Sequence, residues 1–236
     1  MAQIIPNTNL FIVTSAINAT IGAVNREDRI KQTLEGLKIL REQQPNSVII
    51  LSDGGPVAIE EDVLKQFAPY INLAMNWSSD NDVTDFASAG RKSEAECVLL
   101  IKSLMMIQQE PALMQMMQGV KRIYKLSART NLLEEFNEEE HDHFGKYVFK
   151  KRMPTWIADE RKEQFTDLLI TRMYSFCPSL ISDYIQTLYK IIGGILKYHV
   201  DTEHAHYFYI NKQYLVELDQ IHCKGIVAGS GQSETY

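Results

Sequence analysis

Two nearly continuous apolar segments lie near the start of the chain, and a helical pattern separates them. The segments are Leu10 to Ser15 and Ser47 to Gly55, and both have the composition of strands buried on two faces. Between them, apolar residues recur every three or four positions from Arg26 to Gln43, and Asn25 precedes this pattern as a predicted N-cap. A buried strand, an amphipathic helix and a second buried strand predict a βαβ unit with a parallel sheet.

Shorter elements follow in the middle of the chain. The pattern predicts a helix near 60–67, a short strand at 71–75, a helix ended by Pro111 and a buried strand from Arg122 to Arg129. The stretch from Asn76 to Ser93 is polar and has no periodicity, so we expect a functional or mobile loop there. Ser93 and Glu96 have the spacing of a capping box at the start of the next helix.

The second half of the chain mixes strands and helices less regularly. An acidic run at 134–143 is expected in solvent. The pattern further predicts strands at 146–154 and 167–176, a long helix from Pro178 to about Tyr198, a short helix capped by Asp201, strand-like runs at 214–218 and 221–228, and a flexible tail at 229–236. Because no internal repeat or linker interrupts the chain, we predict a single α/β domain. It would have a mostly parallel central sheet, flanking helices and mixed strands in its C-terminal half.

Composition narrows the class of protein and of partner. The chain has 236 residues, of which 45% are apolar and 23% charged, which is typical of a soluble globular protein. Its net charge of −6 argues against a nucleic-acid backbone as the main partner, although a local basic cluster could bind one phosphate ligand. Three widely spaced cysteines, no apolar run of about 18 residues and no basic, apolar N-terminal signal lead us to expect a cytoplasmic protein without a membrane span.

Polar residues follow the predicted parallel strands at their carboxyl ends, where open α/β sheets bind ligands. These residues are Thr14 and Ser15 after the first strand, Asp53 after the second, and Arg129 after the strand that begins at Arg122. Asp53 could accept hydrogen bonds from a ribose or a base, or it could simply begin an Asp-Gly turn. Neither GxGxxG nor a P-loop motif is present, so a dinucleotide loop is not indicated.

Two basic segments are candidate phosphate-binding sites. Arg91 and Lys92 follow a glycine and precede a helix, whose first N–H groups favour an anion. Lys150 and Arg152 lie close to Trp156, and together they could clamp a diphosphate and stack on a ring. The first segment could instead be a solvated loop with a capped helix, and for the second a charged strand edge at the surface is the more common explanation.

The segment 201–206 is the best catalytic candidate in the chain. It contains Asp201, Glu203, His204 and His206. Glu203 and His206 share one face of a helix, and a carboxylate beside an imidazole can supply a general base or metal ligands. Asp201 could instead serve only as an N-cap.

The order of these elements resembles the GT-A fold of nucleotide-sugar glycosyltransferases. The resemblance is carried by the segments "LFIVTSAI", "VIILSDGG", "GRKSEAE" and "RIYKLSAR". It implies that Thr14, Ser15 and Asp53 contact the base and ribose of a nucleotide-sugar donor, and that Arg91 and Lys92 contact its phosphates. It also implies a nucleotide-binding half at 1–130 and an acceptor and catalytic half at 131–236, with the segment 201–206 supplying the later acidic base and a metal-binding histidine, His206.

The sequence departs from this family at the metal site. The family's DxD motif carries Mn²⁺ or Mg²⁺, but Ser127-Ala128-Arg129 stands in its place here. The resemblance therefore leaves two alternatives open. Either no metal is used and cations such as Arg129, Lys150, Lys151 or Arg152 neutralise the leaving diphosphate, or the chain is not an active transferase. Use of Mn²⁺ or Mg²⁺ and metal-independent transfer stay equally open.

The leading hypothesis is a glycosyltransferase that moves a sugar from a nucleotide-sugar donor to an unknown acceptor. Glu203 or Asp201 would deprotonate the acceptor hydroxyl, and His204 or His206 would orient that base. A non-catalytic binding module on the same scaffold is the alternative. The methionine-rich stretch also leaves an oligomer open, although core packing explains such residues as well; its members are Met105, Met106, Met114, Met116 and Met117.

Overall fold

A seven-stranded central sheet organises the protein, as a computed structural model shows for residues 9–20, 22, 24–226 and 233–236. Its strands are, in spatial order, β10 (Leu215–Leu218), β6 (Tyr147–Lys150), β9 (Met173–Phe176), β4 (Arg122–Ser127), β1 (Asn9–Ser15), β2 (Val48–Asp53) and β3 (Leu73–Asn76). Strand β9 is antiparallel to both of its neighbours, and the other adjacent pairs are parallel. The predicted mostly parallel α/β sheet is therefore confirmed.

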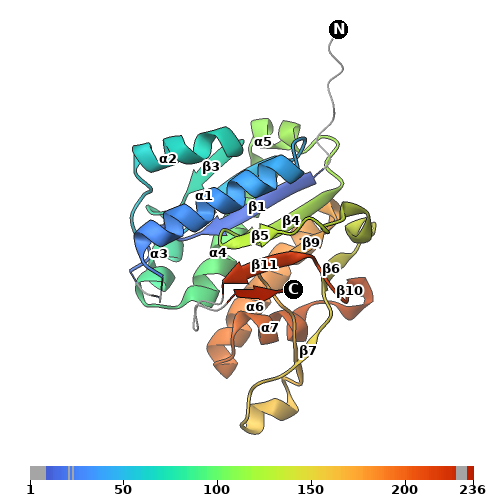
Figure 1. Cartoon of the computed structure of the whole chain (residues 1–236). Helices are drawn as coiled ribbons and strands as arrows, with labels where there is room; N and C mark the ends of the chain where they lie inside the picture. The colour runs from blue at the N-terminus through green and yellow to red at the C-terminus, as the bar shows by residue number, and fades with distance from the viewer. Residues whose placement is uncertain (1–8, 21, 23, 227–232) are drawn as a thin grey trace.

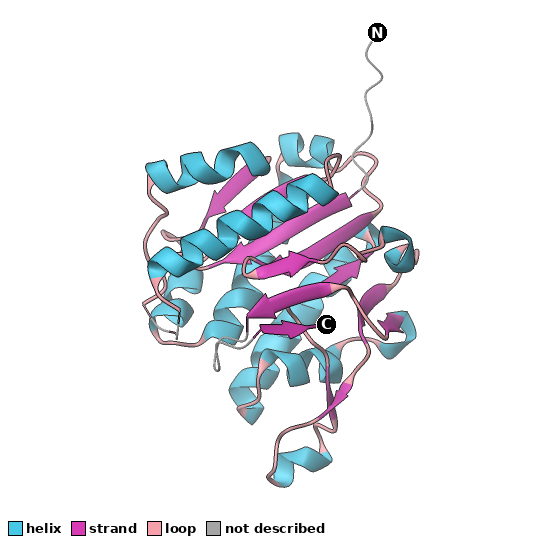
Figure 2. Cartoon of the chain, in the orientation of Figure 1, coloured by secondary structure: helices cyan, strands magenta, loops and turns pink. Residues whose placement is uncertain are grey.

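Helices cover both faces of this sheet (Figures 1 and 2). The helices are α1 (Arg26–Gln43), α2 (Glu61–Phe67), α3 (Asn81–Ser88), α4 (Lys92–Gln109), α5 (Pro111–Met116), α6 (Ile181–Tyr198) and α7 (Thr202–Tyr209). Short 3₁₀ turns lie between them, at η1 (Ala68–Tyr70), η2 (Glu138–His141), η3 (Glu160–Glu163), η4 (Pro178–Leu180) and η5 (Lys212–Tyr214). Within the described residues, every helix is too short or too polar to cross a membrane.

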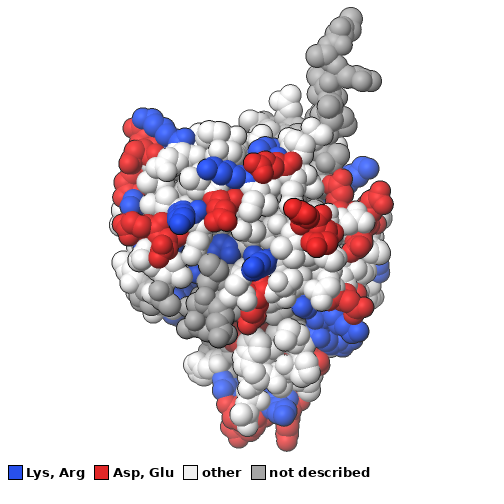
Figure 3. Space-filling view, in the orientation of Figure 1, with Lys and Arg blue, Asp and Glu red and all other residues white. Residues whose placement is uncertain are grey.

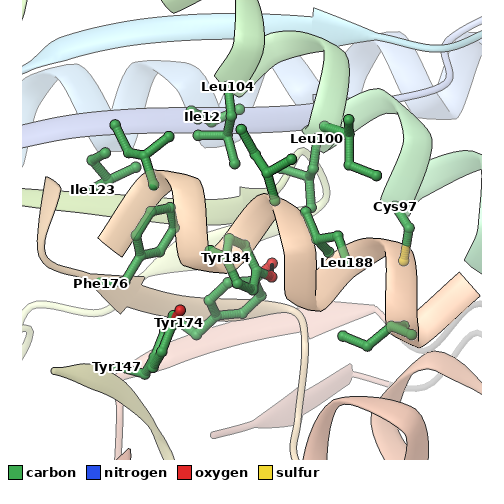
Figure 4. Packing of buried hydrophobic residues seen from close by; sticks show 14 of the residues in the cluster. Ile12, Cys97, Leu100, Leu104, Ile123, Tyr147, Tyr174, Phe176, Tyr184 and Leu188 are labelled. Atoms are coloured by element: carbon green, nitrogen blue, oxygen red, sulfur yellow. Dashed lines mark hydrogen bonds between the residues drawn. The ribbon is translucent and has the colours of Figure 1, made fainter. Parts of the chain in front are cut away.

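The side chains of β1 point alternately to the two faces of the sheet, which explains why helices must cover both faces. Phe11 and Val13 belong to the core cluster that contains Leu37 of α1. Ile12 belongs to the opposite cluster, with Leu104 of α4 and residues of α6 (Figure 4). Since successive side chains of a strand point to opposite faces, an uninterrupted apolar run is buried only when both faces are covered.

Two small ladders extend from the second half of the chain. Strands β5 (Thr130–Leu132), β11 (Cys223–Ile226) and β12 (Ser233–Thr235) form an antiparallel sheet, and β5 packs against α1. Strands β7 (Met153–Pro154) and β8 (Asp167–Leu168) pair at the base of a protruding segment that contains η3. We call this segment, residues 153–168, the arm; it protrudes at the lower end of the molecule in Figure 1.

Several predicted elements agree closely with the structure. Helix α1 has the predicted bounds, and the side chain of Asn25 accepts a hydrogen bond from the Asp28 amide as its N-cap. Asp201 likewise caps α7, accepting from the amide of His204. Pro111 separates α4 from α5 as expected, because a proline cannot continue the helix before it.

The loop expected at 76–93 is wrong, because α3 lies within it. Asp80 caps this helix through the Val83 amide, and Val83 is buried against the core. A single inward-facing apolar residue is too weak a signal for a periodicity argument. The capping box of Ser93 and Glu96 is also wrong, because the N-cap of α4 is Arg91, two residues before Ser93, and the Glu96 side chain bonds elsewhere.

Three strand predictions need smaller corrections. Strand β4 ends at Ser127, so the last two residues of the run 122–129 form a turn. The run 146–154 is divided into β6 and β7, and the run 167–176 is divided into β8 and β9. The tail expected to be flexible contributes β12, which pairs with β11. The last part of the run 221–228 and the glycine-rich segment after it lie outside the described residues.

Candidate functional site

A cavity of about 350 Å³ opens at the carboxyl ends of β1 and β4, where the sheet order changes direction. Its walls come from the loop after β1, the first turns of α4 and α7, and the residues before β9. Five residues that were candidates from the sequence meet in this lining, namely Thr14, Ser15, Lys92, Arg129 and Glu203. The cavity therefore joins residues from both halves of the chain.

Cations dominate the charged lining of the cavity. The described charged residues there are Arg29, Lys92, Arg129 and Arg172 against Glu96 and Glu203. A Cβ at Gly22, where φ is +138°, would lie 2.7 Å from Nη2 of Arg29 and 3.3 Å from Nζ of Lys92. Those two cations thus converge on one backbone position that only glycine accommodates. On the outer face drawn in Figure 3, by contrast, basic and acidic side chains are interspersed.

Arg129 has an unfilled hydrogen-bonding position. Its Nη1 atom is buried and has no hydrogen-bond partner. Burial lowers the pKa of Arg129, and the neighbouring charges of Arg29 and Arg172 lower it further. A buried donor without a partner costs about 1–3 kcal/mol, which an anionic ligand would recover. The arrangement is therefore suited to binding an anion.

An ion pair joins Glu96 of the cavity lining to the buried Lys125. Nζ of Lys125 is 2.6 Å from Oε1 of Glu96 and also donates to the Ser127 hydroxyl at 2.8 Å and the Thr171 carbonyl at 2.7 Å. The Thr14 hydroxyl donates to the same Glu96 oxygen at 2.8 Å. Burial opposes ionisation of Glu96, but Lys125 and Thr14 together lower its pKa, so the carboxylate stays charged.

Glu203 is the second carboxylate in the lining. It accepts a hydrogen bond from the Thr171 hydroxyl at 3.0 Å. Burial raises its pKa, and the charge of Asp201 raises it further. A carboxylate with a raised pKa beside a cavity can take a proton from a bound hydroxyl group.

Asp201 and His204 flank the lining residues Thr202 and Glu203 in the chain and do not belong to the cavity lining. Oδ1 of Asp201 is 2.6 Å from Nδ1 of His204, and Nε2 of His204 is 2.8 Å from the Thr155 hydroxyl. His204 is completely buried. These contacts connect the start of α7 to the arm, and the predicted catalytic roles of both residues stay predictions.

Both ring nitrogens of His206 already have protein partners. Nε2 is 3.0 Å from the Tyr184 hydroxyl, and Nδ1 is 2.8 Å from the Thr202 carbonyl. Burial lowers the pKa of His206 to about 4, so the ring is neutral. Its partners leave no nitrogen lone pair directed at a metal.

The residues where the GT-A family holds its cation do not fit Mn²⁺ or Mg²⁺. These ions require oxygen ligands, whereas Ser127 and Ala128 are followed by the cation Arg129. Across the described ranges, no group of three or more histidine, cysteine, aspartate or glutamate residues is placed to hold a metal. We therefore derive no step through a metal ion.

Asp53 connects the two loops below the cavity. Its carboxylate accepts hydrogen bonds from the Ser15 hydroxyl at 2.6 Å, the Ile17 amide at 2.9 Å and the Gly55 amide at 3.1 Å. Burial raises its pKa despite these bonds. Asp53 is buried and does not belong to the cavity lining, and its predicted contact with a nucleoside stays a prediction.

The other predicted cations lie outside the lining, each with a protein contact. Arg91 is paired with Glu94 at 3.0 Å, and the Lys150 ammonium lies 5.5 Å from the centre of the Tyr236 ring. Arg152 is 3.1 Å from Glu217. Their predicted phosphate contacts are not tested by this arrangement.

Four charged residues of the site were not among the candidates predicted from the sequence. They are Arg29, Glu96, Lys125 and Arg172. Lys125 did carry a signal, because a lysine in the middle of a strand buried on both faces requires a partner. Arg29 and Arg172 had none, since each stands in a segment where a charged residue is ordinary.

No protein-family model matches the sequence, and no curated protein is detectably similar to it. The structure, in contrast, is similar to solved glycosyltransferases. The mannosyltransferase Ktr4p from S. cerevisiae superimposes with a TM-score of 0.50 at 8% identity, over 89% of this chain and 68% of the other. Mouse xyloside xylosyltransferase 1 gives 0.48 at 11% identity over 91% and 85%. The Mn/GDP form of core-mannan synthase A from Aspergillus fumigatus gives 0.47 at 9% over 85% and 68%. The chain has the GT-A-like fold of nucleotide-diphospho-sugar glycosyltransferases.

Proposed function

We propose that this protein is a glycosyltransferase that moves a sugar from a nucleoside-diphosphate-sugar donor to an acceptor hydroxyl. The observation that carries the proposal is the partnerless Nη1 of Arg129, which lies among the other cavity arginines at the carboxyl ends of parallel strands. A diphosphate supplies several acceptor oxygens and the negative charge that such a cluster favours. The GT-A-like fold is a scaffold on which this chemistry occurs, although a fold alone does not establish a function.

The donor would lie across the cavity with its diphosphate among the cations. Arg29, Lys92, Arg129 and Arg172 would bind the phosphate oxygens. The nucleoside would occupy the side formed by the loop after β1, beginning at Thr14 and Ser15. In this arrangement the sugar points toward α7, where Glu203 lines the opposite wall.

Transfer would then follow from the positions of these groups. The acceptor oxygen forms a bond to the anomeric carbon while the bond from that carbon to the diphosphate oxygen breaks. The electron pair of the broken bond stays on the diphosphate, where the arginines stabilise the developing charge. Glu203 takes the proton of the acceptor hydroxyl. The products are a glycoside and a nucleoside diphosphate.

A transfer assay tests the role of the arginines. Release of nucleoside diphosphate would be followed for UDP-, GDP- and dTDP-sugars with methyl glycosides as acceptors, and for CMP-sugars as release of CMP. We expect Arg129→Met to lower donor affinity by about tenfold to a hundredfold, the equivalent of one or two charged hydrogen bonds at about 1.5–3 kcal/mol each. Lys190→Met removes an exposed cation of α6 outside the cavity and serves as the control.

The same assay separates transfer from mere binding. If donors bind at the cavity and no product forms with any acceptor, the protein is a binding module, an alternative favoured by the missing carboxylate at Ser127-Ala128-Arg129. Equal donor affinity in Arg129→Met and Lys190→Met would contradict the proposed phosphate site.

A further inference from the structure

The arm carries an exposed aromatic side chain next to the start of α7. Trp156 is 59% exposed, and Met153 on the same arm is 39% exposed. Single exposed apolar residues are common and need no ligand. What distinguishes Trp156 is the set of contacts that fixes its orientation.

A chain of polar contacts holds Trp156 in place. The Thr155 hydroxyl is 2.8 Å from Nε2 of His204, and Nδ1 of His204 is 2.6 Å from Asp201. With the Nδ1 proton directed to Asp201, Nε2 accepts the Thr155 hydroxyl proton, and that oxygen in turn accepts the Ile157 amide at 3.1 Å. The backbone on both sides of Trp156 is thereby attached to a buried imidazole.

The indole ring itself also contacts α7. It meets the His204 ring edge-to-face, with centroids 5.1 Å apart and planes at 88°. Burial opposes ionisation of Asp201, but hydrogen bonds from His204, together with one from Trp156, lower its pKa. An indole already held in one orientation loses little conformational entropy when a ligand stacks on it.

The same turn of α7 holds the arm and forms the wall of the cavity. Asp201 and His204 contact the arm, while Thr202 and Glu203 between them line the cavity. Consecutive Cα atoms are about 3.8 Å apart. Asp201 and His204, which hold Trp156, are therefore close neighbours in the chain of Glu203, the proposed base. One acceptor molecule could contact both Trp156 and Glu203.

We propose that Trp156 is the platform of an acceptor subsite that binds a sugar ring. One face of a pyranose is largely C–H and would stack on the indole, while its hydroxyls would bond to the Asp201 carboxylate, whose side chain is 33% exposed. This inference rests on the proposed function and assigns its acceptor to the carbohydrates.

The surroundings favour a sugar over a lipid chain. Beyond Ala158 the exposed residues of the arm are polar or charged, among them Asp159, Glu160 and Lys162. A lipid would require a continuous apolar surface, whereas a sugar requires one flat apolar face with polar groups beside it.

Intrinsic fluorescence tests the subsite without any turnover. The chain has two tryptophans, and the other, Trp77, donates its indole N–H to the Ser52 hydroxyl at 3.1 Å. In Trp77→Phe, with excitation selective for tryptophan over the 11 tyrosines, the emission comes from Trp156 alone. Methyl glycosides and disaccharides of glucose, mannose, galactose and xylose, titrated into the millimolar range and above, should change that emission saturably. An emission unchanged by all of them would overturn the proposal.

Kinetics of the full protein provide the second test. Trp156→Ala should raise the KM for the sugar acceptor roughly tenfold, the effect of one aromatic contact, while Trp156→Phe retains part of it. Donor affinity should be unchanged in both, and Phe144→Ala, which removes a side chain 88% exposed elsewhere, is the control. Equal KM values in all variants would contradict the subsite. Failure of the wild type to bind any nucleotide sugar would instead contradict the proposed function, and a saturable fluorescence response to sugars would then still be measurable.

Discussion

Arg129 and Asp53, two ligand contacts predicted from the sequence, differ in how far protein partners already use their hydrogen-bonding atoms. Arg129 is surrounded by cations and has a donor without a partner, whereas Asp53 uses its carboxylate on three protein donors. Both stand at the carboxyl end of a predicted strand, so the strand pattern predicts both equally as ligand contacts. Only the packing of the loops shows which one faces the cavity. The partners of a polar group decide whether it is available for a ligand.

Replacement of Glu203 tests the base at the residue scale. We expect Glu203→Gln to lower turnover by about 10²–10⁴-fold while donor affinity is nearly unchanged, because a positioned base acts on the chemical step. Its raised pKa implies that turnover in the native protein increases as pH rises through a value above the usual 4.5. Steady-state rates across pH measure both effects. Glu110→Gln, an exposed carboxylate at the end of α4, is the control, and full activity in Glu203→Gln would refute the assignment.

The ion pair of Lys125 and Glu96 should make a pH-dependent contribution to the free energy of unfolding. Since the pKa of Glu96 in the folded protein lies below its ordinary value of 4.5, its ionised form stabilises the fold above that pH. That stabilisation should be lost as pH falls through the lowered pKa. Lys125→Met should cost about 3 kcal/mol, because it leaves a carboxylate without its cation. Urea denaturation at pH 7 measures this loss, and a cost below about 1 kcal/mol would mean that Glu96 is solvated from the cavity.

At the scale of elements, the small sheet of β5, β11 and β12 supports the cavity from behind. The Arg172 guanidinium lies 5.7 Å from the centre of the Tyr236 ring, directly after β12. A Cβ on Gly225 of β11 would lie 3.0 Å from the Thr130 hydroxyl and 3.3 Å from Cδ of Arg172. The small sheet thus determines where one of the cavity cations stands.

If the cavity binds the donor as proposed, Tyr236 would position Arg172 for it. We expect Tyr236→Ala to weaken donor binding severalfold, since a cation–π contact of this kind contributes about 0.5–2 kcal/mol. Tyr236→Phe keeps the ring and should retain most of the affinity. Calorimetric titration measures the donor affinity of both variants. Equal losses of affinity would show that the hydroxyl is what matters, and no loss in either variant would remove Tyr236 from the site.

Elements with a strong apolar pattern could be predicted from the sequence, and those without one could not. The bounds of α1 and the parallel order of β1 and β2 follow from long apolar runs whose two faces both need cover. Helix α3 has one buried apolar residue, and β12 forms only because β11 offers it an edge. Such elements depend on contacts with distant segments, which local periodicity does not report.

At the scale of the whole molecule, the fold gathers cations that are scattered along the chain into one place. Arg29, Lys92, Arg129 and Arg172 come from four separate segments, yet all line the same cavity in a protein whose net charge is −6. The meeting of Thr14, Ser15 and Arg129 was foreseeable from the rule that ligands bind at strand carboxyl ends, whereas only the resemblance to the GT-A fold brought Lys92 and Glu203 to the same site. The contributions of Arg29 and Arg172 depended on how α1 and the residues before β9 pack.

The most direct test of the central claim is a thermal-shift screen of UDP-, GDP-, CMP- and dTDP-sugars, each with EDTA and with Mn²⁺. A donor at about 100 times its dissociation constant should add about 2.7 kcal/mol to the free energy of unfolding. We predict a clear rise in the melting temperature for one nucleotide family, with EDTA present, that is lost in Arg129→Met. No rise with any nucleotide sugar under either condition would contradict the donor site.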